Sequence, residues 1–262
     1  MVDQTQKHDA SEGSPEKEND PKEMPFLDHL EELRWRIMKA AGAIFVITLI
    51  AFPFTGTMLN FLTLPNDHLE SPAKMIFLKP TGMLMVRLQI ALVAGLIASL
   101  PVIFYQFWMF VSPGLMENEK KFVIPSLVIT TACFLLGSAF AYWILIPTVL
   151  PFLFSMGTDT IEATINITEY MGFVLRLILV AGLVFELPVL SFLLARIGIL
   201  TPQFMRKYRR YGIVIFFVFA AIVTPPDPMS QILIAVPLVL LYEISILIAV
   251  VAQKKKQEKE EI

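Results

Sequence analysis

The stretch "EYMGFVLRLILVAGLVFELPVLSFLL", residues 169–194, is an apolar segment with few polar side chains. It is longer than the roughly 20 residues that an α-helix needs to cross the hydrocarbon core of a membrane. Two of its residues stand out, because Glu186 is a carboxylic acid and Pro188 cannot donate a backbone hydrogen bond. The segment therefore predicts a membrane-spanning helix with a kink and a buried acid.

The composition of the whole chain supports a membrane location. Of the 262 residues, 56% are hydrophobic and only 17% are charged, and the mean hydropathy is +0.67. A soluble domain of this size carries more charge on its surface. The single cysteine, Cys133, excludes an internal disulfide, and no spacing of metal ligands is present. We therefore expect an integral membrane protein without a metal or another cofactor.

Six spanning helices are predicted, which makes the fold class an all-α integral membrane protein. The expected spans are Ile37–Met58, Met83–Phe107, Phe122–Pro147, Glu169–Leu194, Tyr211–Thr224 and Met229–Val250. The fifth contains "YGIVIFFVFAAIV", which as a helix covers only ~20 Å of a ~30 Å hydrocarbon core. We expect spans 5 and 6 to form a short spanning hairpin that thins the bilayer locally. A re-entrant pair is the alternative.

Lysine and arginine predict the orientation. Most of them lie before span 1, after spans 2 and 4, and after span 6, whereas the opposite loops hold only Lys74 and Lys79. The positive-inside rule places both termini in the cytoplasm, and a bacterial inner (plasma) membrane is the simplest location. Residues 1–24 are predicted to be a disordered cytoplasmic tail, residues 25–252 the transmembrane domain, and residues 253–262 a second cytoplasmic tail.

Three stretches outside the apolar cores carry polar groups. In "PFLDHLEELRWRIMKA", residues 25–40, Asp28, Glu32 and Arg36 share a face at i,i+4 spacing, which predicts an amphipathic helix on the inner surface. The stretch "PVIFYQFWMFVSPGLMENEKKFVIP", residues 101–125, ends span 2 among aromatic residues and continues into a loop with two glutamates. The third, "FVFAAIVTPPDPMSQILIAVP", residues 217–237, encloses a Pro-Pro turn; there Asp227 is expected to cap span 6.

Known catalytic and nucleotide-binding motifs are missing from the sequence. It contains no GxxxxGK[ST] loop, no HExxH and no GxSxG. No serine lies beside a credible base, and the three histidines fall in the N-terminal stretches and an external loop. We therefore do not expect an enzyme.

Four blocks resemble the signature blocks of the TatC family, the six-span subunit of the twin-arginine protein translocase. They are "FLDHLEELRWR", "YQFWMFVSPGLMENEKK", "FELPV" and "TPPDPMSQ", and they occur in the family's order over roughly residues 25–252. The resemblance implies a receptor that binds signal peptides with two consecutive arginines and helps to carry folded proteins across the membrane, using the proton motive force. It implies self-association within the complex and contact with membrane lipid, but no nucleic acid.

The resemblance also implies a signal-peptide site on the cytoplasmic face. Its residues in this sequence are Glu119, Glu32, Arg34, Phe110 and Gln106. The chemistry fits, because a carboxylate accepts the planar fork of a guanidinium in a bidentate way that an ammonium cannot copy. Two adjacent arginines need two such acceptors, which Glu32 and Glu119 supply. From the sequence alone, Glu117 is an equal substitute for Glu119.

Glu186 allows more than one interpretation. Arg176 lies ~15 Å away along the helix axis, too far for a direct pair. A neutral glutamate bonded to a neighbouring helix is one possibility, a residue facing a water-filled recess is another, and a small proton-coupled transporter using Glu186 is the rival function. A passive scaffold is a third. The resemblance favours a functional intramembrane carboxyl on a concave face.

Single-span partner subunits are expected to contact the hairpin. In the TatC family, TatA and TatB contact this region, and Thr224 and Gln231 match polar positions in that contact. Ala221 is small at a position that is often bulky in relatives, which leaves the detailed fit of the partner helix open.

Overall fold

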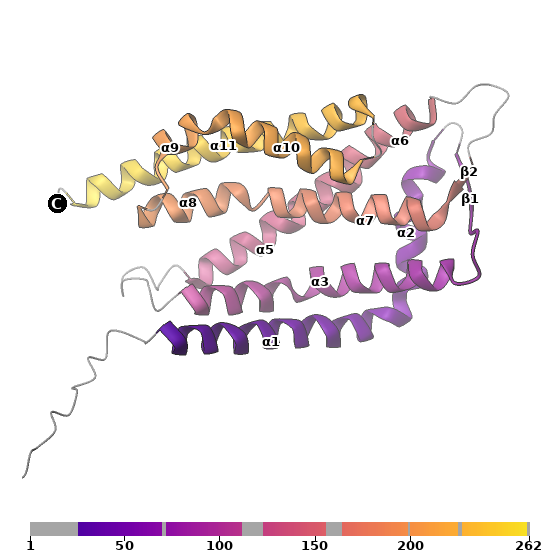
Figure 1. Ribbon diagram of the computed structural model, residues 1–262, viewed down its shortest axis with the longest axis horizontal. Helices are drawn as coiled ribbons and strands as arrows, with labels where there is room; N and C mark the ends of the chain where they lie inside the picture. Colours follow the sequence, from indigo (N-terminus) through magenta and orange to yellow (C-terminus); the bar gives the residue numbers. More distant parts are fainter. Residues whose placement is uncertain are drawn as a thin grey trace, which may run out of the picture.

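The computed structural model describes residues 26–69, 72–111, 123–155, 164–198, 200–224 and 227–260. In chain order the elements are α1 (Phe26–Ala51), η1 (Phe52–Phe54), α2 (Thr55–Asp67), β1 (Lys74–Ile76), α3 (Gly82–Val111), α5 (Val123–Phe140), η3 (Ala141–Leu145), α6 (Ile146–Ser155), β2 (Thr164–Asn166), α7 (Ile167–Val184), α8 (Leu187–Ile197), α9 (Pro202–Lys207), α10 (Arg209–Val223) and α11 (Pro228–Glu260). The long helices run between two ends of the molecule (Figure 1). We call the end at which α1 begins the N-terminal end, and the opposite one, with β1 and β2, the strand end.

Five helical stretches of the described residues are long and apolar enough to cross a membrane. They are Asp28–Asp67, Gly82–Val111, Ile124–Ser155, Ile167–Arg196 and Pro228–Lys254. They correspond to predicted spans 1, 2, 3, 4 and 6. The predicted fifth span is α10, whose 15 residues cover only ~22 Å. The chain is thus a multi-pass helical membrane protein.

The predicted amphipathic segment and span 1 up to Ala51 form one unbroken helix, α1, whereas the predicted end of span 1 at Met58 lies in α2, beyond a break. Pro53 follows α1 and cannot donate a backbone hydrogen bond, so the chain tightens into the single 3₁₀ turn η1 before α2 begins. Phe52 O accepts from the Thr55 backbone N–H and also, at 2.8 Å, from Thr55 Oγ1, so both groups of Thr55 close this turn. The turn redirects the chain, and α2 crosses the strand end of the bundle (Figure 1).

Two predicted boundaries are wrong. Span 3 was expected to end at Pro147, but the helical stretch continues to Ser155. The π-helical turn η3 lies directly before this proline, the kind of irregularity at which a helix accommodates one. The sixth span was expected to be short, yet its apolar stretch runs over Pro228–Lys254 and α11 continues to Glu260. The glutamines, lysines and glutamates of that last part favour a helix.

The strand end is tied together by contacts that the sequence did not predict. β1 and β2 pair in parallel, with Met75 opposite Ile165. The side chain of Asn66 accepts from the N–H of Ala73 at 3.1 Å and donates to its carbonyl at 3.2 Å. The loop after α2 is therefore fixed against the loop that precedes α7.

A proline in α2 explains the most informative of these contacts. Pro65 lies inside the helix, so the carbonyl of Phe61, four residues earlier, lacks its usual donor. The hydroxyl of Tyr142 donates to this carbonyl at 2.7 Å, and the Tyr142 ring stacks on the Phe61 ring at 4.4 Å between centroids. Tyr170 donates in the same way to Leu62 O at 3.1 Å. The two tyrosines thus hold α2 against η3 and α7.

Two glycines allow α5 and α7 to pack closely. A Cβ atom on Gly137 of α5 would lie 2.6 Å from the carbonyl oxygen of Ala181 on α7. A Cβ atom on Gly182 would lie 2.7 Å from the ring of Phe134 on α5. Small residues at such crossings let helix backbones approach each other inside a membrane. This crossing lies immediately before the break between α7 and α8.

We predict that Tyr142→Phe lowers the free energy of unfolding by about 1–2 kcal/mol, because the Phe61 carbonyl then has no donor in an apolar environment. The phenylalanine keeps the ring stack, so the loss reports the hydroxyl alone. Denaturant unfolding in detergent micelles measures it.

The matched control is the same substitution in a Pro65→Ala background. Alanine restores a backbone N–H for the Phe61 carbonyl, so Tyr142→Phe should there have little effect. An equal loss in both backgrounds would show that the tyrosine does not replace the missing proline donor.

Candidate functional site

The N-terminal end contains a polar cluster that joins α1 to the end of α3. The Arg36 guanidinium donates through Nε to Glu32 Oε1 at 2.9 Å, and its Nη2 reaches the same oxygen. His29 Nδ1 lies 3.6 Å from the other oxygen, Glu32 Oε2. The His29 ring stacks on Phe110 of α3, with centroids 4.2 Å apart and an interplanar angle of 11°. We call His29, Glu32, Arg36 and Phe110 the N-terminal cluster.

One carboxylate oxygen of this cluster is without a hydrogen bond. Glu32 Oε2 is buried and accepts none from the described residues. The side chains of Glu32 and Arg36 are only 23% and 17% exposed. The carboxylate therefore already binds one guanidinium and keeps acceptor capacity on its second oxygen.

The remaining residues of the predicted signal-peptide site are only partly placed. Gln106 and Phe110 lie half-buried on the last turns of α3, and Arg34 is exposed on α1. Arg34 is two residues from Glu32, so the two side chains leave the helix on different faces. Glu119 lies outside the described residues, as does Glu117. The structure thus brings Glu32 and Phe110 into one cluster.

The sequence analysis did not place His29 or Arg36 in the candidate site. The i,i+4 pair of Glu32 and Arg36 was expected on the helix face and is confirmed. The role of His29 was not predicted, although its i,i+3 spacing from Glu32 was a signal for it. Its stack on Phe110 joins residues far apart in the sequence, which no local pattern indicates.

Glu186 lies at the break between α7 and α8. The helix ends at Val184, Phe185 and Glu186 form a turn, and α8 begins at Leu187 with a proline in its first turn. The predicted kink is therefore confirmed. The Glu186 side chain is 3% exposed, and neither carboxylate oxygen has a hydrogen-bond partner among the described residues. A buried polar group without a partner is unfavourable for folding, so Glu186 is a strong candidate for a function.

Apolar packing on α8, the helix that follows Glu186, connects α8 to the end of α3. Trp108 of α3 is 4% exposed and packs with Val189 and Leu193 of α8. Cys133 of α5 packs against the same cluster and is half-buried, as expected for a thiol among apolar neighbours. Trp108 is two residues from Phe110, so the last turns of α3 contact α8 and also contribute Phe110 to the N-terminal cluster.

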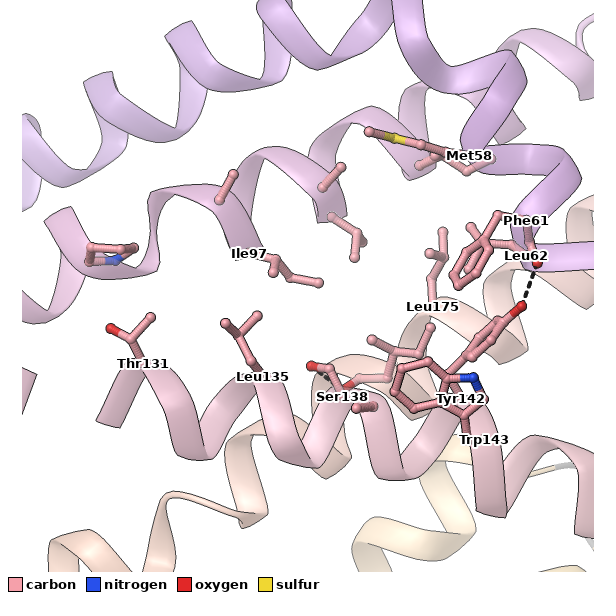
Figure 2. A pocket seen from close by; sticks show the side chains of 17 residues that line it. Met58, Phe61, Leu62, Ile97, Thr131, Leu135, Ser138, Tyr142, Trp143 and Leu175 are labelled. Carbon is pink, nitrogen blue, oxygen red and sulfur yellow. Dashed lines mark hydrogen bonds between the residues drawn. The ribbon is translucent and has the colours of Figure 1, made fainter. Parts of the chain in front are cut away.

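An apolar cavity of about 530 Å³ lies between α2, α3, α5 and α7. Figure 2 shows Thr131, Leu135 and Ser138 on one wall and Ile97 across from them, with Phe61, Tyr142 and Trp143 closing one side. The Ser138 hydroxyl is used within the bundle, at 3.5 Å from Ile178 O. Glu186 is not among the residues that line the cavity. This cavity is therefore not the recess that Glu186 was expected to face.

The hairpin of α10 and α11 is closed by its own polar side chains. The Thr224 backbone N–H and hydroxyl both donate to Ala220 O at 2.9 Å. Gln231 Nε2 of α11 donates to Phe217 O of α10, also at 2.9 Å. Asp227 Oδ2 accepts from the N–H of Ser230 at 2.6 Å, which confirms the predicted cap of span 6.

The described residues contain no group of three histidine, cysteine or acidic side chains that could hold a metal ion. The candidate sites are therefore a carboxylate–guanidinium cluster at the N-terminal end, a buried carboxyl group, an apolar cavity and a polar hairpin.

Comparisons with known proteins give one consistent result. Residues 28–237 match the family described as "Sec-independent protein translocase protein (TatC)". A TatC protein of Desulforapulum autotrophicum is 42% identical over 238 residues, which are 90% of this chain and 88% of the relative. One of Aquifex aeolicus is 39% identical over 237 residues, 90% of this chain and 98% of the relative. A crystal structure titled "Twin Arginine Translocase Receptor- TatC" superposes with a TM-score of 0.79 at 38% identity, covering 86% of this chain and 99% of that chain.

Proposed function

The chain belongs to the TatC family of Sec-independent protein translocases, and we propose that it is the core receptor subunit of a twin-arginine translocase. In this proposal it binds Arg-Arg signal peptides at the cytoplasmic face and assembles with single-span TatA- and TatB-like subunits and with copies of itself. The assembly carries folded proteins across a bacterial inner membrane with the proton motive force. The family consists of translocase components and not of enzymes.

The observation that carries the proposal is the N-terminal cluster. Glu32 already accepts a guanidinium from Arg36, and its Oε2 has no hydrogen bond with any of the described residues. A carboxylate has acceptor sites on both oxygens, so a second guanidinium binds at Oε2 once the His29 ring moves aside. Glu119, in the segment that follows α3, is the proposed acceptor for the other arginine of the pair.

Arg36 is expected to remain in place when the peptide binds. Its side chain is mostly buried, and displacing it would leave a cation without its partner, which is more unfavourable than sharing one carboxylate between two guanidiniums. Arg36 therefore acts as a positioning residue, because it fixes the rotamer of Glu32 with Oε2 available.

The arrangement of the helix ends supports the proposed orientation. The start of α1, the end of α3 and the end of α11 lie at the same end of the molecule (Figure 1). The proposed cytoplasmic face is this N-terminal end, which also carries most of the lysine and arginine residues. Both termini are then cytoplasmic.

The rival hypothesis of a small proton-coupled transporter receives no support from the comparisons. Its central residue, Glu186, lies outside the apolar cavity, and no titratable side chain of the described residues forms a hydrogen bond with it.

We predict that Glu32→Gln and Glu119→Ala each weaken binding of an Arg-Arg signal peptide about tenfold or more, because each removes one charged acceptor. Fluorescence anisotropy with the purified protein in detergent measures the affinity. A peptide with Lys-Lys should also bind more weakly, since an ammonium cannot form the bidentate contact.

Glu169→Gln is the matched control, because Glu169 is an exposed acid at the opposite, strand end. It changes the net charge equally and should leave the affinity unchanged. If Glu169→Gln weakens binding as much as Glu32→Gln does, the peptide responds to total charge and not to this cluster.

For Glu186 we propose a role in transport after the peptide has bound. We predict that Glu186→Leu raises the free energy of unfolding by about 1–3 kcal/mol, because it removes a buried acid without a partner. The same variant should lower transport of a folded Arg-Arg substrate in membrane vesicles, and Glu186→Gln should also impair transport while it inserts normally. Full transport by Glu186→Leu would contradict the proposed role.

Thr224 and Gln231 are proposed to lie at the contact with the partner subunits, where their hydrogen bonds within the hairpin hold its shape. Gln231→Ala removes the bond to Phe217 O and is predicted to reduce the amount of TatA- or TatB-like subunit that copurifies with the chain. Gln253→Ala, further along α11, is the control and should keep the partner. Partner retention by Gln231→Ala would place the contact elsewhere.

A further inference from the structure

The corner at which α8, α9 and α10 meet carries a concentration of exposed cations. The cations lie where α9 ends and α10 begins, at the N-terminal end of the molecule. They are Arg206, Lys207, Arg209 and Arg210. Phe204, Tyr208 and Tyr211 are exposed between them. We call the four cations the basic corner. It shares no residue with the N-terminal cluster, and it does not include Thr224 or Gln231 of the hairpin.

Contacts with neighbouring helices hold the backbone of the basic corner in place. Thr201 caps α9 by accepting from the N–H of Phe204 at 3.2 Å. Met205 is 5% exposed, and its carbonyl accepts from the hydroxyl of Tyr242 on α11 at 2.9 Å. Gly198 ends α8 in the left-handed conformation, at φ 92°, which turns the chain toward α9. The four cations therefore project from a backbone that these contacts hold in position.

The charges of the corner are only partly balanced. Arg209 forms an ion pair with Glu243 of α11. Arg210 stacks on the Tyr211 ring at 4.8 Å and donates to its hydroxyl at 3.0 Å, and Lys207 lies 5.7 Å from the centre of the Tyr208 ring. These aromatic contacts hold the cations in place without neutralising them. Among the described residues, Glu243 is thus the one acid that forms an ion pair with any of the four cations.

The corner also lies at the edge of an exposed apolar surface. Beyond Tyr211, the exposed side chains of α10 are apolar: Val214, Val218 and Ile222 are 54–62% exposed and follow one another along the helix. Exposed aromatic residues and cations next to such a face are typical of the level of the lipid headgroups. A lipid whose chains cover α10 would place its headgroup beside the corner.

From this juxtaposition we propose that the basic corner binds the headgroup phosphate of an anionic phospholipid, with the acyl chains lying along the exposed face of α10. Clustered lysine and arginine side chains at a membrane surface attract anionic headgroups, and arginine can bind a phosphate oxygen pair with two parallel hydrogen bonds. Arg206, Lys207 and Arg210 provide the phosphate contacts, while Arg209 remains paired with Glu243. The proposal is independent of the signal-peptide site.

Native mass spectrometry of the full chain in detergent tests the proposal, with phosphatidylglycerol and phosphatidylcholine titrated separately. Phosphatidylglycerol should bind more tightly. The triple variant Arg206→Gln, Lys207→Gln, Arg210→Gln should reduce its affinity by about tenfold or more and leave the affinity for phosphatidylcholine unchanged.

The matched control is Lys74→Gln, Lys79→Gln, Arg87→Gln, which removes the same number of exposed cations at the strand end. It should keep phosphatidylglycerol binding, and thermal unfolding confirms that both triple variants are folded. Equal losses in the two variants, or equal affinity for the two lipids in the unchanged protein, would overturn the proposal. Displacement of the lipid by millimolar inorganic phosphate would overturn it as well, because the corner would then bind the free anion.

Discussion

Inside a bilayer no water is available to the backbone, so every N–H and carbonyl group needs a partner within the protein. This constraint explains both the helices and the way in which they break. Pro65 removes the donor for Phe61 O, and Tyr142 from another helix supplies one at 2.7 Å. Pro53 interrupts the first span, and Thr55 donates to the carbonyl at that turn. The bond from Tyr142 is thus a tertiary contact that replaces a hydrogen bond removed by a proline.

The break between α7 and α8 differs from these, because its polar group is left without a partner. Gly137 and Gly182 bring α5 and α7 into close contact just before Glu186. Both of its carboxylate oxygens lack a hydrogen bond within the described residues. A buried carboxyl group with neither oxygen hydrogen-bonded is unfavourable for folding, and the proposed transport role is a reason for keeping it.

Local patterns predicted much of the fold and of the site. The kink at Pro188, the cap by Asp227 and the pair of Glu32 and Arg36 each depend on residues within four positions of one another, and all three are present. The bond from Tyr142 to Phe61 joins residues 81 positions apart. The stack of His29 on Phe110 and the pairing of β1 with β2 are also long-range contacts. Such contacts depend on how the helices are packed, and hydrophobic periodicity in one sequence carries no information on that.

The packing at the end of α3 suggests how a surface site and a buried acid can belong to one function. Phe110 belongs to the N-terminal cluster through its stack on His29, and Trp108, two residues earlier, packs on Val189 and Leu193 of α8. The α8 helix begins directly after Glu186. In the proposed binding mode, a peptide guanidinium that moves His29 away from Glu32 would remove the ring that stacks on Phe110, and a shift of the α3 end would then act on α8 through Trp108. Closely packed interiors transmit such displacements, and the turn at Phe185 and Glu186 is the point between α7 and α8 that can absorb them.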